Sequence, residues 1–528
     1  MFEKAGRGMS KFLKGTMILL LAGFITRILG FINRIVIARF IGEEGVGLYM
    51  MAYPTLVLVI TITQLGLPVA IAKNVAEAEA KGDFAKIKKI LTVSLATTVS
   101  LSIIFTPALL ILTPYLSQTL FTDERVMYPL LAITPVVPIV AVSSVIRGYF
   151  QGRQNMKPAA ISQILEQIIR ISLIALLTKA FLPYGIEYAA AGAMIASVIG
   201  ELISLVYLFT SFKLKKRFKL RTNFFKFVQG GRDTFQDLMS IALPTTGSRM
   251  IGSISWFFEP IVVVHSLALA GVVTVVATKQ YGALTGYALP LLFLPSFITN
   301  SLSTSLVPAI SEANSLNDTK LIEYRLQQAL RLTFLTGGLA VVLLFVLADP
   351  LMKLMYGTSS GTTFIKIMAP FFIFYYYQQP LQATLQALNL ARAAMINSLI
   401  GAGVKTAVIF ILASQPSFGI NGAALGIITG FVLVTFLHFA TVLKRISFSV
   451  YVWEYVKTFI VIGITGWSGF WLLGHFLVQS SLALKVILAT MEMSVIYFVL
   501  LFVFKLLHKE DIKRIPWIGK LIPNWAMR

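Results

Sequence analysis

Three arginines stand inside a run of residues that is otherwise suited to lipid. The run is FITRILGFINRIVIARFIG, residues 24–42, and it contains Arg27, Arg34 and Arg39. An arginine near the centre of a bilayer costs about 2.5–3.5 kcal/mol on insertion scales. A guanidinium stays charged when partly desolvated, and its forked donors match phosphate oxygens. The chemistry that this pattern favours is the binding of an anion at membrane depth.

The three arginines differ in depth along the predicted helix. Small and cationic residues recur at steps of three and four, which places them on one face of the helix: Thr16, Leu20, Gly23, Arg27, Gly30 and Arg34. Arg39 lies near one end, where its side chain can snorkel to the interface. Arg27 lies roughly 20 Å from either end at 1.5 Å per residue, so it is the arginine that most needs a ligand or a partner.

Two interpretations of these arginines stay open at the level of sequence. In the first, Arg27 and Arg34, together with Arg249 of a later helix, line a central cavity and attract an anion. In the second, they form buried structural ion pairs with Glu166, Glu201 or Glu259.

The segment ISQILEQIIR, residues 161–170, adds a carboxylate at membrane depth. Ser162, Glu166 and Arg170 are spaced by four, so Glu166 and Arg170 can pair along one helix face. An internal ion pair is one interpretation. The other is that Glu166 changes partner or protonation during transport, as intramembrane carboxylates often do. Glu201 and Glu259 are further candidates for a coupling site.

The composition requires a membrane protein to hold these residues. Of 528 residues, 57% are hydrophobic and only 13% are charged, which excludes an ordinary soluble domain. A formal net charge of +23 would suggest nucleic acid in a soluble protein. Here the basic residues lie between apolar spans, where they anchor helices on the cytoplasmic side, so we expect a membrane and no nucleic acid as partner.

At about 20 apolar residues per crossing, the chain divides into fourteen predicted helices. We expect an all-α protein of two six-helix lobes and two C-terminal helices. Most Lys and Arg residues fall in alternate connections, which predicts a multi-pass protein of the cell membrane with both termini cytoplasmic. The predicted parts are a first lobe at 1–212, a basic linker at 213–237, a second lobe at 238–442, helices 13 and 14 at 443–506, and a basic tail at 507–528.

Self-comparison indicates that the two lobes are copies. TRILGFI at 26–32 matches SRMIGSI at 248–254, and YGIEYAAAG at 184–192 matches FGINGAALG at 418–426. An offset of 235 pairs Arg170 with Lys405. Because six is an even number of crossings, the copies share one orientation, which predicts an internal parallel repeat.

Several chemistries lack their residues in this sequence. There is no cysteine, and therefore no thiolate metal site or disulfide. No phosphate-binding GxxxxGK[ST] loop and no HExxH motif occur, and no cluster of acidic or histidine residues gathers at one membrane face. We expect a protein that is not an enzyme and that uses no cofactor and no metal.

Two longer blocks carry a family resemblance. They are ARFIGEEGVGLYMMAYPTLVLVITITQLGLPVAIAK and RGYFQGRQNMKPAAISQILEQIIR. They resemble the polysaccharide-exporter branch of the multidrug, oligosaccharidyl-lipid and polysaccharide exporter superfamily, and within it a group of sporulation proteins of endospore-forming bacteria. The resemblance covers essentially the whole chain.

The resemblance implies alternating access without ATP and a groove for a lipid tail at helices 13 and 14. The implied activity is flipping an undecaprenyl-pyrophosphate-linked sugar, the peptidoglycan precursor lipid II, for spore cortex synthesis. Wall-synthesis proteins are the implied protein partners. The rival predictions are export of another lipid-linked polysaccharide unit, and a non-transporting scaffold for wall synthesis.

The carry-over of site residues is partial. Arg27 matches the arginine of the Ser/Thr-Arg-x-Leu-Gly-Phe pattern of the related flippases. Those proteins continue with an Arg-Asp pair where this chain has Asn33 and Arg34, so the charge is displaced by one position, about 100° around the helix. Cavity arginines that relatives carry on helices two and eight have no counterpart, and Arg249 is the expected substitute.

Overall fold

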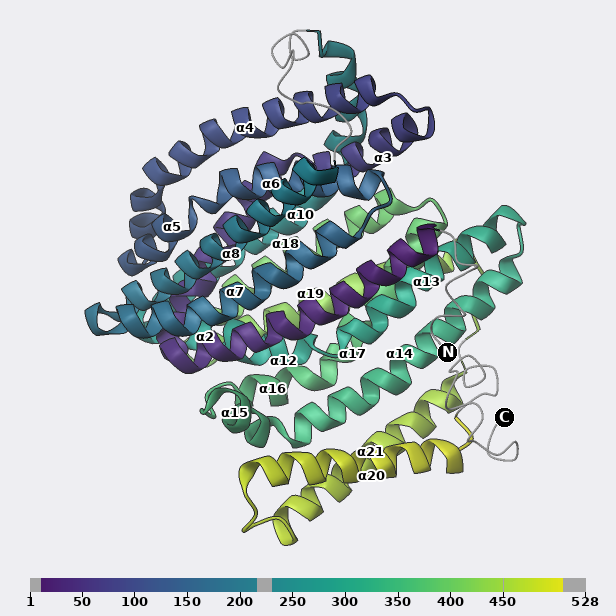
Figure 1. The fold of residues 1–528 in the computed structure, drawn as a ribbon. Coiled ribbons are helices and arrows are strands. Elements are labelled where there is room, and N and C mark those ends of the chain that lie inside the picture. The colour runs from purple at the N-terminus through teal and green to yellow at the C-terminus, as the bar shows by residue number, and fades with distance from the viewer. Residues whose placement is uncertain (1–10, 216–229, 450, 507–528) are drawn as a thin grey trace. The chain divides into compact units, whose positions relative to one another are not determined.

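The computed structural model describes residues 11–215, 230–449 and 451–506. All regular structure in these ranges is helical (Figure 1). The predicted tail at 507–528 lies outside the described residues, as does most of the predicted basic linker. The chain forms two compact units, unit 1 at Met1–Gly286 and unit 2 at Tyr287–Arg528. The predicted lobe limits follow the sequence repeat rather than compactness, and they stay a prediction.

Unit 1 is built from long helices that are broken at glycines or prolines. Its α-helices are α2 (Lys11–Gln64), α3 (Leu67–Ala80), α4 (Phe84–Tyr115), α5 (Met127–Ile133), α6 (Val136–Gly152), α7 (Lys157–Phe181), α8 (Ile186–Lys215), α10 (Arg232–Leu269) and α11 (Thr274–Gly282).

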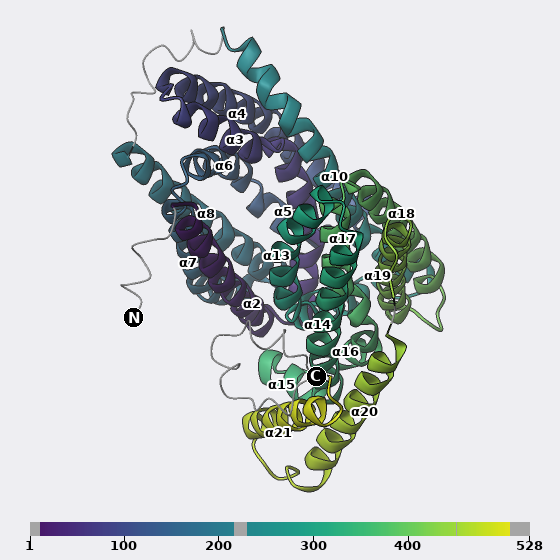
Figure 2. The same ribbon diagram turned by 90° about the vertical axis from the view of Figure 1, so that its right-hand side faces the viewer.

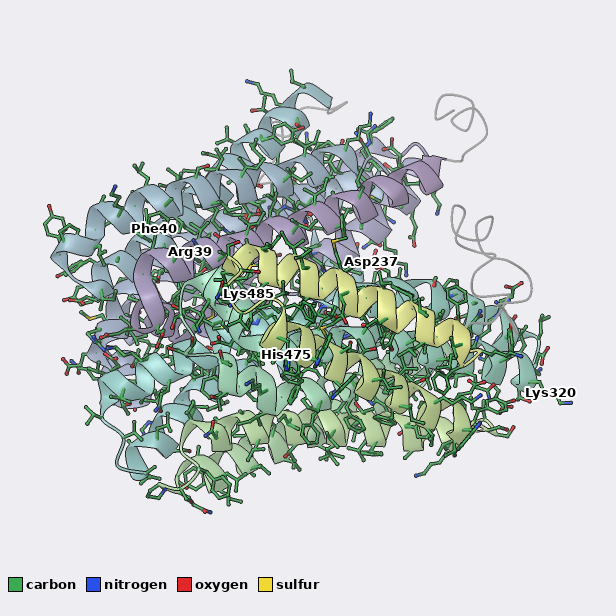
Figure 3. The ribbon with its side chains drawn as sticks, turned by 90° about the horizontal axis from the view of Figure 1, so that it is seen from below. Arg39, Phe40, Asp237, Lys320, His475 and Lys485 are labelled. Atoms are coloured by element: carbon green, nitrogen blue, oxygen red, sulfur yellow. The ribbon has the colours of Figure 1, made fainter. Side chains whose placement is uncertain are left out.

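Unit 2 contains the remaining helices. They are α12 (Leu289–Phe293), α13 (Ser296–Ser315), α14 (Thr319–Val346), α15 (Ala348–Tyr356), α16 (Thr362–Met368), α17 (Phe372–Ala387), α18 (Ala391–Ala413), α19 (Ile420–Leu443), α20 (Val452–His475) and α21 (Leu482–Val503). His475 and Lys485 lie on either side of the turn that joins α20 to α21 (Figure 3).

The number of crossings agrees with the prediction of about fourteen. Eleven helical runs among the described residues are long and apolar enough to cross a membrane, and the bent pair α11–α12 with α13 makes a twelfth. The first of these runs covers two predicted helices, because α2 continues through Gly42, which has φ 65° and ψ −173°. The tenth predicted helix, at 365–389, is divided into α16 and α17 by a 3₁₀ turn at Ala369–Phe371.

The predicted repeat is visible in the local backbone geometry of the two units. Asp83 caps α4 by accepting a hydrogen bond from the Lys86 amide at 2.8 Å. Asp318, 235 residues further on, caps α14 in the same way with the Leu321 amide at 2.9 Å. The turn residues Gln154 and Asn389 are also 235 apart, and both have positive φ, 54° and 61°. Capping and turn chemistry therefore recur at the offset that the sequence repeat predicts.

Close packing of α7 on α8, and of α18 on α19, depends on glycine. A Cβ on Gly192 would approach the Leu177 carbonyl oxygen to 3.1 Å, and one on Gly426 would approach the Ile409 amide nitrogen to 2.8 Å. Helices in a membrane pack closely where small residues let their backbones approach. Arg170 and Lys405, which the repeat pairs, each lie with Cβ against a glycine of the next helix, Gly200 and Gly430.

Candidate functional site

Gly42 divides α2 into a first segment, residues 11–42, and a second segment, residues 43–64. One face of the first segment contains Gly23, Arg27, Gly30 and Arg34, and we call this face the arginine stripe. The first segment lies beside α7 in both views (Figures 1 and 2). Arg27 is exposed. Among the described residues, no acidic side chain lies within 4 Å of its guanidinium. A Cβ on Gly23 or Gly30, which share the face of Arg27, would meet no described atom within 4 Å. This face is therefore not packed against the described part of the protein.

Arg34 and Arg39 have different surroundings from Arg27. Arg34 is half-buried, and its Nη1 donates to the Met50 sulfur at 3.7 Å. Asn33 beside it is buried, at 6% exposure. Arg39 is exposed near the Gly42 break, next to the exposed ring of Phe40 (Figure 3). Of the three cations, Arg34 is half-buried, whereas Arg27 and Arg39 are exposed.

Arg249 and Glu259 lie on α10, which packs on the second segment of α2. A hydrogen bond of 3.0 Å joins the hydroxyls of Thr61 and Ser253, and the rings of Tyr53 and Trp256 meet edge-on at 5.7 Å. Arg249, one turn before Ser253, is exposed, and it too lacks an acidic partner within 4 Å in the described ranges. A Cβ on the neighbouring Gly252 would meet no described atom within 4 Å.

Glu259 is separated from Arg249 by almost three helical turns. The side chain of Glu259 is buried, at 9% exposure. It lies within electrostatic range of Tyr281, which is itself fully buried on α11. The two α10 residues that the sequence singled out therefore do not form one site.

A buried ionic cluster joins α6, α7 and α8. We define the ionic cluster as Arg147, Glu166, Arg170 and Glu201. Glu166 Oε1 accepts from Arg170 Nη2, as the spacing of four allows, and Glu166 Oε2 lies 3.8 Å from Arg147 Nη2. Glu201 Oε1 accepts from Arg147 Nη2 at 2.9 Å. Two guanidinium groups balance two carboxylates, so the cluster has no formal net charge.

Hydroxyl groups add hydrogen bonds to the ionic cluster, although the buried Nε atoms of Arg147 and Arg170 have no hydrogen-bond partner among the described residues. Ser143 donates to Glu201 Oε1 at 2.6 Å, and Arg147 donates to the Ser204 hydroxyl at 3.1 Å. Glu166 and Glu201 are 8% and 4% exposed. Buried charges that are paired and hydrogen-bonded in this way fix the helices that carry them. The partners of Glu166 and Glu201 are thus Arg147 and Arg170, and not Arg27.

Arg147 is the member of the cluster that sequence reasoning missed. A usable signal was present, because Ser143 and Arg147 are four apart in the same pattern as Ser162, Glu166 and Arg170. Polar residues at matching spacing on two helices indicate facing surfaces.

A second polar network holds α11 against α2 near the Gly42 break. Arg125 binds both oxygens of Asp123, with Nε–Oδ1 at 3.0 Å and Nη2–Oδ2 at 2.9 Å, and it also donates to Glu44. Thr278 of α11 donates to Asp123 Oδ2 at 2.8 Å. Lys279 Nζ lies 3.4 Å from Glu44 Oε2. One continuous set of charge-assisted bonds therefore connects the start of α5, the bend of α2 and α11.

Electrostatics and backbone packing both support this network. Burial by itself would raise the pKa of Asp123, but hydrogen bonds from Arg125 and Thr278 and the Arg125 charge outweigh it, so the pKa lies below the usual 3.8. The helices approach closely at two glycines: a Cβ on Gly47 would lie 2.1 Å from the Thr278 carbonyl oxygen, and one on Gly282 would lie 2.1 Å from the Glu43 carbonyl oxygen.

Comparison with known proteins shows the family. A family model described as polysaccharide biosynthesis protein matches residues 12–314, and one described as MatE matches residues 260–411. The chain is 61% identical to Stage V sporulation protein B of Bacillus subtilis (strain 168), over 97% of this chain and 99% of that protein. It is 26% identical to the Lipid II flippase MurJ of the same organism, over 80% and 82% of the two chains.

Solved structures of a flippase and of a transporter have the same fold as this chain. The structure described as "Lipid II flippase MurJ, inward closed conformation" aligns with a TM-score of 0.67 at 16% identity, covering 92% of this chain and 98% of that chain. An inward-facing multidrug resistance MATE family transporter of the MOP superfamily aligns with a TM-score of 0.66 at 17% identity, covering 80% and 94%. The fold, the many apolar helices and the near full-length relatives lead to one assignment: this chain is a multi-pass membrane protein of the polysaccharide biosynthesis protein family, within the exporter superfamily that also contains the MATE transporters.

Proposed function

We propose that this protein flips lipid II, an undecaprenyl-pyrophosphate-linked peptidoglycan precursor, across the cytoplasmic membrane by alternating access. The process that it serves is synthesis of the spore cortex. The similarity to the relatives supports a membrane flippase or exporter. The lipid II substrate rests on the similarity to the flippase MurJ, and the cortex role rests on the similarity to Stage V sporulation protein B.

The observation that carries the proposal is the environment of Arg27. It is exposed on a face with two uncovered glycines, and no acidic side chain of the described ranges neutralises it. Lipid contact would be costly for a guanidinium at this depth. Water and an anionic substrate group would satisfy it, because the guanidinium fork matches two phosphate oxygens.

Arg34 and Arg249 complete the proposed substrate-binding surface of unit 1. Arg34 lies two helical turns beyond Arg27 on the same stripe, and its half-buried side chain is fixed against Met50. Arg249 occupies the repeat position of Arg27, beside Gly252 as Arg27 is beside Gly30, and it is exposed in the same way. With several cations in a row, a moving pyrophosphate would stay close to a positive charge at every step.

The ionic cluster supplies the proposed coupling residues. Glu166 lies between Arg147 of α6 and Arg170 of its own helix, so a shift of α6 against α7 would change its partner. Glu201, on α8, forms an ion pair with Arg147. Glu259, buried on α10, is a separate carboxylate for the same role. An exchange of partners inside a buried charge set converts helix movement into a change of proton or ion affinity.

The proposed orientation places both termini in the cytoplasm, with wall-synthesis proteins as partners on the far side of the membrane. No native cysteine occurs in the chain, so single cysteines report topology without background. Cysteine in place of Lys320, in the first turn of α14, should react only after the inner side is opened to a membrane-impermeant maleimide. Cysteine in place of Ser481, before α21, should react from outside. The opposite pattern would contradict the orientation.

The test of the proposed activity uses purified protein in liposomes with fluorescent lipid II on one side. We expect translocation that requires the protein and does not require ATP. A parallel assay with an undecaprenyl-pyrophosphate-linked polysaccharide repeat unit separates the main rival: faster movement of that lipid would assign the protein to polysaccharide export. No movement of any lipid-linked sugar, under either sign of membrane potential, would contradict a transport function.

A further inference from the structure

Unit 2 contains a carboxyl group that belongs to neither the arginine stripe nor the ionic cluster. Glu492 lies on α21, ten residues after the first residue of this helix and eleven before the last, which is about 15 Å from either end at 1.5 Å per residue. The helix has 22 residues and is long and apolar enough to cross a membrane. Because the hydrocarbon core is about 30 Å thick, Glu492 lies close to its midplane.

Apolar residues surround Glu492 on its own helix. Met491 and Val495 are each 61% exposed, as expected for a helix face in contact with lipid tails. Ala489 and Met493, on the other side, are fully buried in helix contacts. Glu492 itself is half-buried, so it lies at the border between the lipid-facing side of α21 and its packed side.

The polar group that α20 presents to Glu492 is a hydroxyl. The Glu492 carboxyl lies within hydrogen-bonding range of Ser468. This contact is next to the close approach of the two helices, where a Cβ on Gly469 would lie 2.5 Å from the Met493 sulfur. Glu492 Oε2 is buried and has no hydrogen-bond partner in the described part of the chain. One carboxyl oxygen is thus shielded without being hydrogen-bonded.

The hydrogen bonding of Ser468 determines which form of the carboxyl group it can bind. The one hydroxyl proton of Ser468 is donated to the Thr465 carbonyl oxygen at 2.8 Å. Towards Glu492, the Ser468 oxygen therefore offers lone pairs and no donor. An ionised carboxylate also has lone pairs only, whereas a protonated carboxyl group has an O–H to donate. The contact is therefore favourable only when Glu492 carries a proton.

The basic residues on α21 and on the neighbouring α15 are bonded elsewhere. Lys485, seven residues before Glu492, donates from Nζ to the Val478 carbonyl oxygen at 3.0 Å. On α15, which packs on α21, Lys353 forms an ion pair with Asp349 at 2.7 Å. Among the described residues, no basic side chain lies within 4 Å of the Glu492 carboxyl group.

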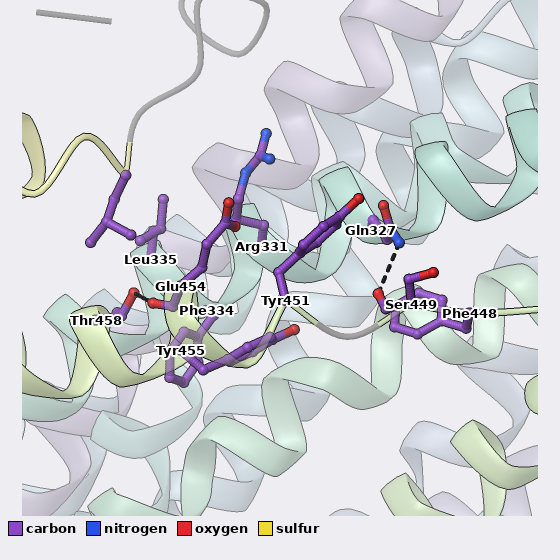
Figure 4. Close-up of a pocket in the computed structure, with 11 residues that line it drawn as sticks. Gln327, Arg331, Phe334, Leu335, Phe448, Ser449, Tyr451, Glu454, Tyr455 and Thr458 are labelled. Atoms are coloured by element: carbon purple, nitrogen blue, oxygen red, sulfur yellow. Dashed lines mark hydrogen bonds between the residues drawn. The ribbon is translucent and has the colours of Figure 1, made fainter. Parts of the chain in front are cut away.

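The charged residues of α14 and α20 lie far from the level of Ser468. Arg331, the last charged residue of α14, and Glu454 line a small pocket at the start of α20 (Figure 4). Glu454 precedes Ser468 by fourteen residues, on the order of 20 Å at 1.5 Å per residue. Lys457 is one turn beyond Glu454, and His475 is the last residue of α20. None of these groups compensates a negative charge at the middle of the helix pair.

We propose that Glu492 is a proton-binding site of the α20–α21 pair, and that it carries its proton while the two helices are packed together. An ionised carboxylate without a cation would be costly at this depth, so release of the proton requires water or a cation to reach the contact with Ser468. A protonated acid inside the bilayer is also the side chain that an apolar carbodiimide modifies. This proposal does not depend on transport of lipid II.

The test is covalent labelling of the full-length protein in nanodiscs with dicyclohexylcarbodiimide, which enters the bilayer. The O–H of a carboxylic acid adds across a C=N bond of the reagent: the oxygen bonds to the central carbon and the proton goes to nitrogen, which gives an O-acylisourea. Transfer of the acyl group from that oxygen to a nitrogen gives a stable N-acylurea, which peptide mass spectrometry detects. Glu492 should react on the order of tenfold faster than Glu166 and Glu201, because carboxylates paired with arginines lack the proton that the addition needs. A membrane-impermeant quaternary-ammonium carbodiimide should not label Glu492.

Two variants of one exposed position test the dependence on a nearby charge. Val495→Lys places an ammonium group one turn from Glu492, on the exposed side of α21. It should suppress labelling on the order of tenfold, because an ion-paired carboxylate loses its proton. Val495→Met changes the same position without adding charge and should be labelled as the wild type is. Glu492→Gln keeps a donor towards Ser468, so its thermal melting should match that of the wild type.

Several outcomes would overturn the proposal. Glu492 of the wild type could be labelled no faster than Glu166 and Glu201, or folded Val495→Lys and Val495→Met proteins could be labelled equally. Labelling of Glu492 by the membrane-impermeant reagent at the rate of the apolar one would place the carboxyl group in water. Protection of Glu492 by sodium ions at constant pH would assign a metal-cation site in place of a proton site. All of these results can be read whether or not the protein flips lipid II.

Discussion

At the residue scale, the molecule separates charges that meet a partner from charges that do not. Arg147 and Arg170 are paired with Glu201 and Glu166 inside unit 1. Arg27 has no acidic partner within 4 Å among the described residues. Arginines of the ionic cluster thus stabilise the fold, whereas for Arg27 we propose the binding of a ligand.

Removing Arg147 should destabilise the protein, because buried carboxylates would lose an ion-pair partner. In Arg147→Met, Glu201 loses its partner and Glu166 keeps only Arg170, so we expect a loss of about 3–5 kcal/mol in the free energy of unfolding. Thermal melting in detergent measures this. Lys213→Met, which removes an exposed charge from α8, should change little. Addition of Glu201→Met to Arg147→Met should restore part of the loss, and a purely additive double variant would argue against the pairing.

Asp123 should make the stability of unit 1 depend on acid. Its pKa is lowered in the folded state, because Arg125 and Thr278 together outweigh burial. Its contribution is therefore complete above the usual pKa of 3.8 and is lost as pH falls through the lowered native value. Asp123→Asn should lower the free energy of unfolding by about 2 kcal/mol at neutral pH, and thermal melting at several pH values should show this difference shrinking in acid. A difference that grows on acidification would contradict this assignment.

At the element scale, pairs of helices approach closely at glycines where a larger side chain would collide with the neighbouring helix. The approach of α11 to α2 is closest at Gly47 and Gly282. The polar network of Asp123, Arg125 and Thr278 then fixes the register of the two helices. Close backbone approach and hydrogen bonding stabilise the same helix contact, so weakening either one should destabilise the packing of α11 on α2.

Adding one methyl group at this contact should be costly. Gly47→Ala places a Cβ against the Thr278 carbonyl oxygen, which is backbone and cannot rotate away, so α2 and α11 must separate. We expect a loss of about 1–3 kcal/mol, typical of overpacking, measured by thermal melting. Gly252→Ala on α10 has open space around its Cβ and should be tolerated. Equal effects of the two substitutions would show that the close contact is not maintained.

The sequence predicted most helices but not how they break. Apolar runs of about 20 residues identify crossings because the bilayer core sets their length. The kink in α2 lies at a single residue of positive φ, Gly42, and hydropathy does not predict such a position. The ionic cluster was half visible, since Glu166 and Arg170 share a helix while Arg147 and Glu201 come from two others. Sequence periodicity predicts which residues share one face of a helix. It does not predict which helix faces pack against each other, because that depends on tertiary structure.

At the scale of the whole molecule, the sequence duplication accounts for local features that recur along the chain. Asp83 and Asp318 cap corresponding helices, and Arg170 and Lys405 lie against glycines in corresponding places. Arg27 and Arg249 are both exposed, each next to an uncovered glycine. The presence of an exposed arginine at both copies of one repeat position favours the proposal that the two residues share an anionic ligand.

The central claim is that Arg27 binds the pyrophosphate of a lipid-linked wall precursor during transport. The most direct test is the rate of lipid II translocation in proteoliposomes for Arg27→Ala beside Arg39→Ala, two arginines of the same helix segment. Loss of a charge-assisted interaction should slow Arg27→Ala roughly 10- to 100-fold, with Arg39→Ala close to wild type. Equal rates for the wild type and a folded Arg27→Ala variant would contradict the account.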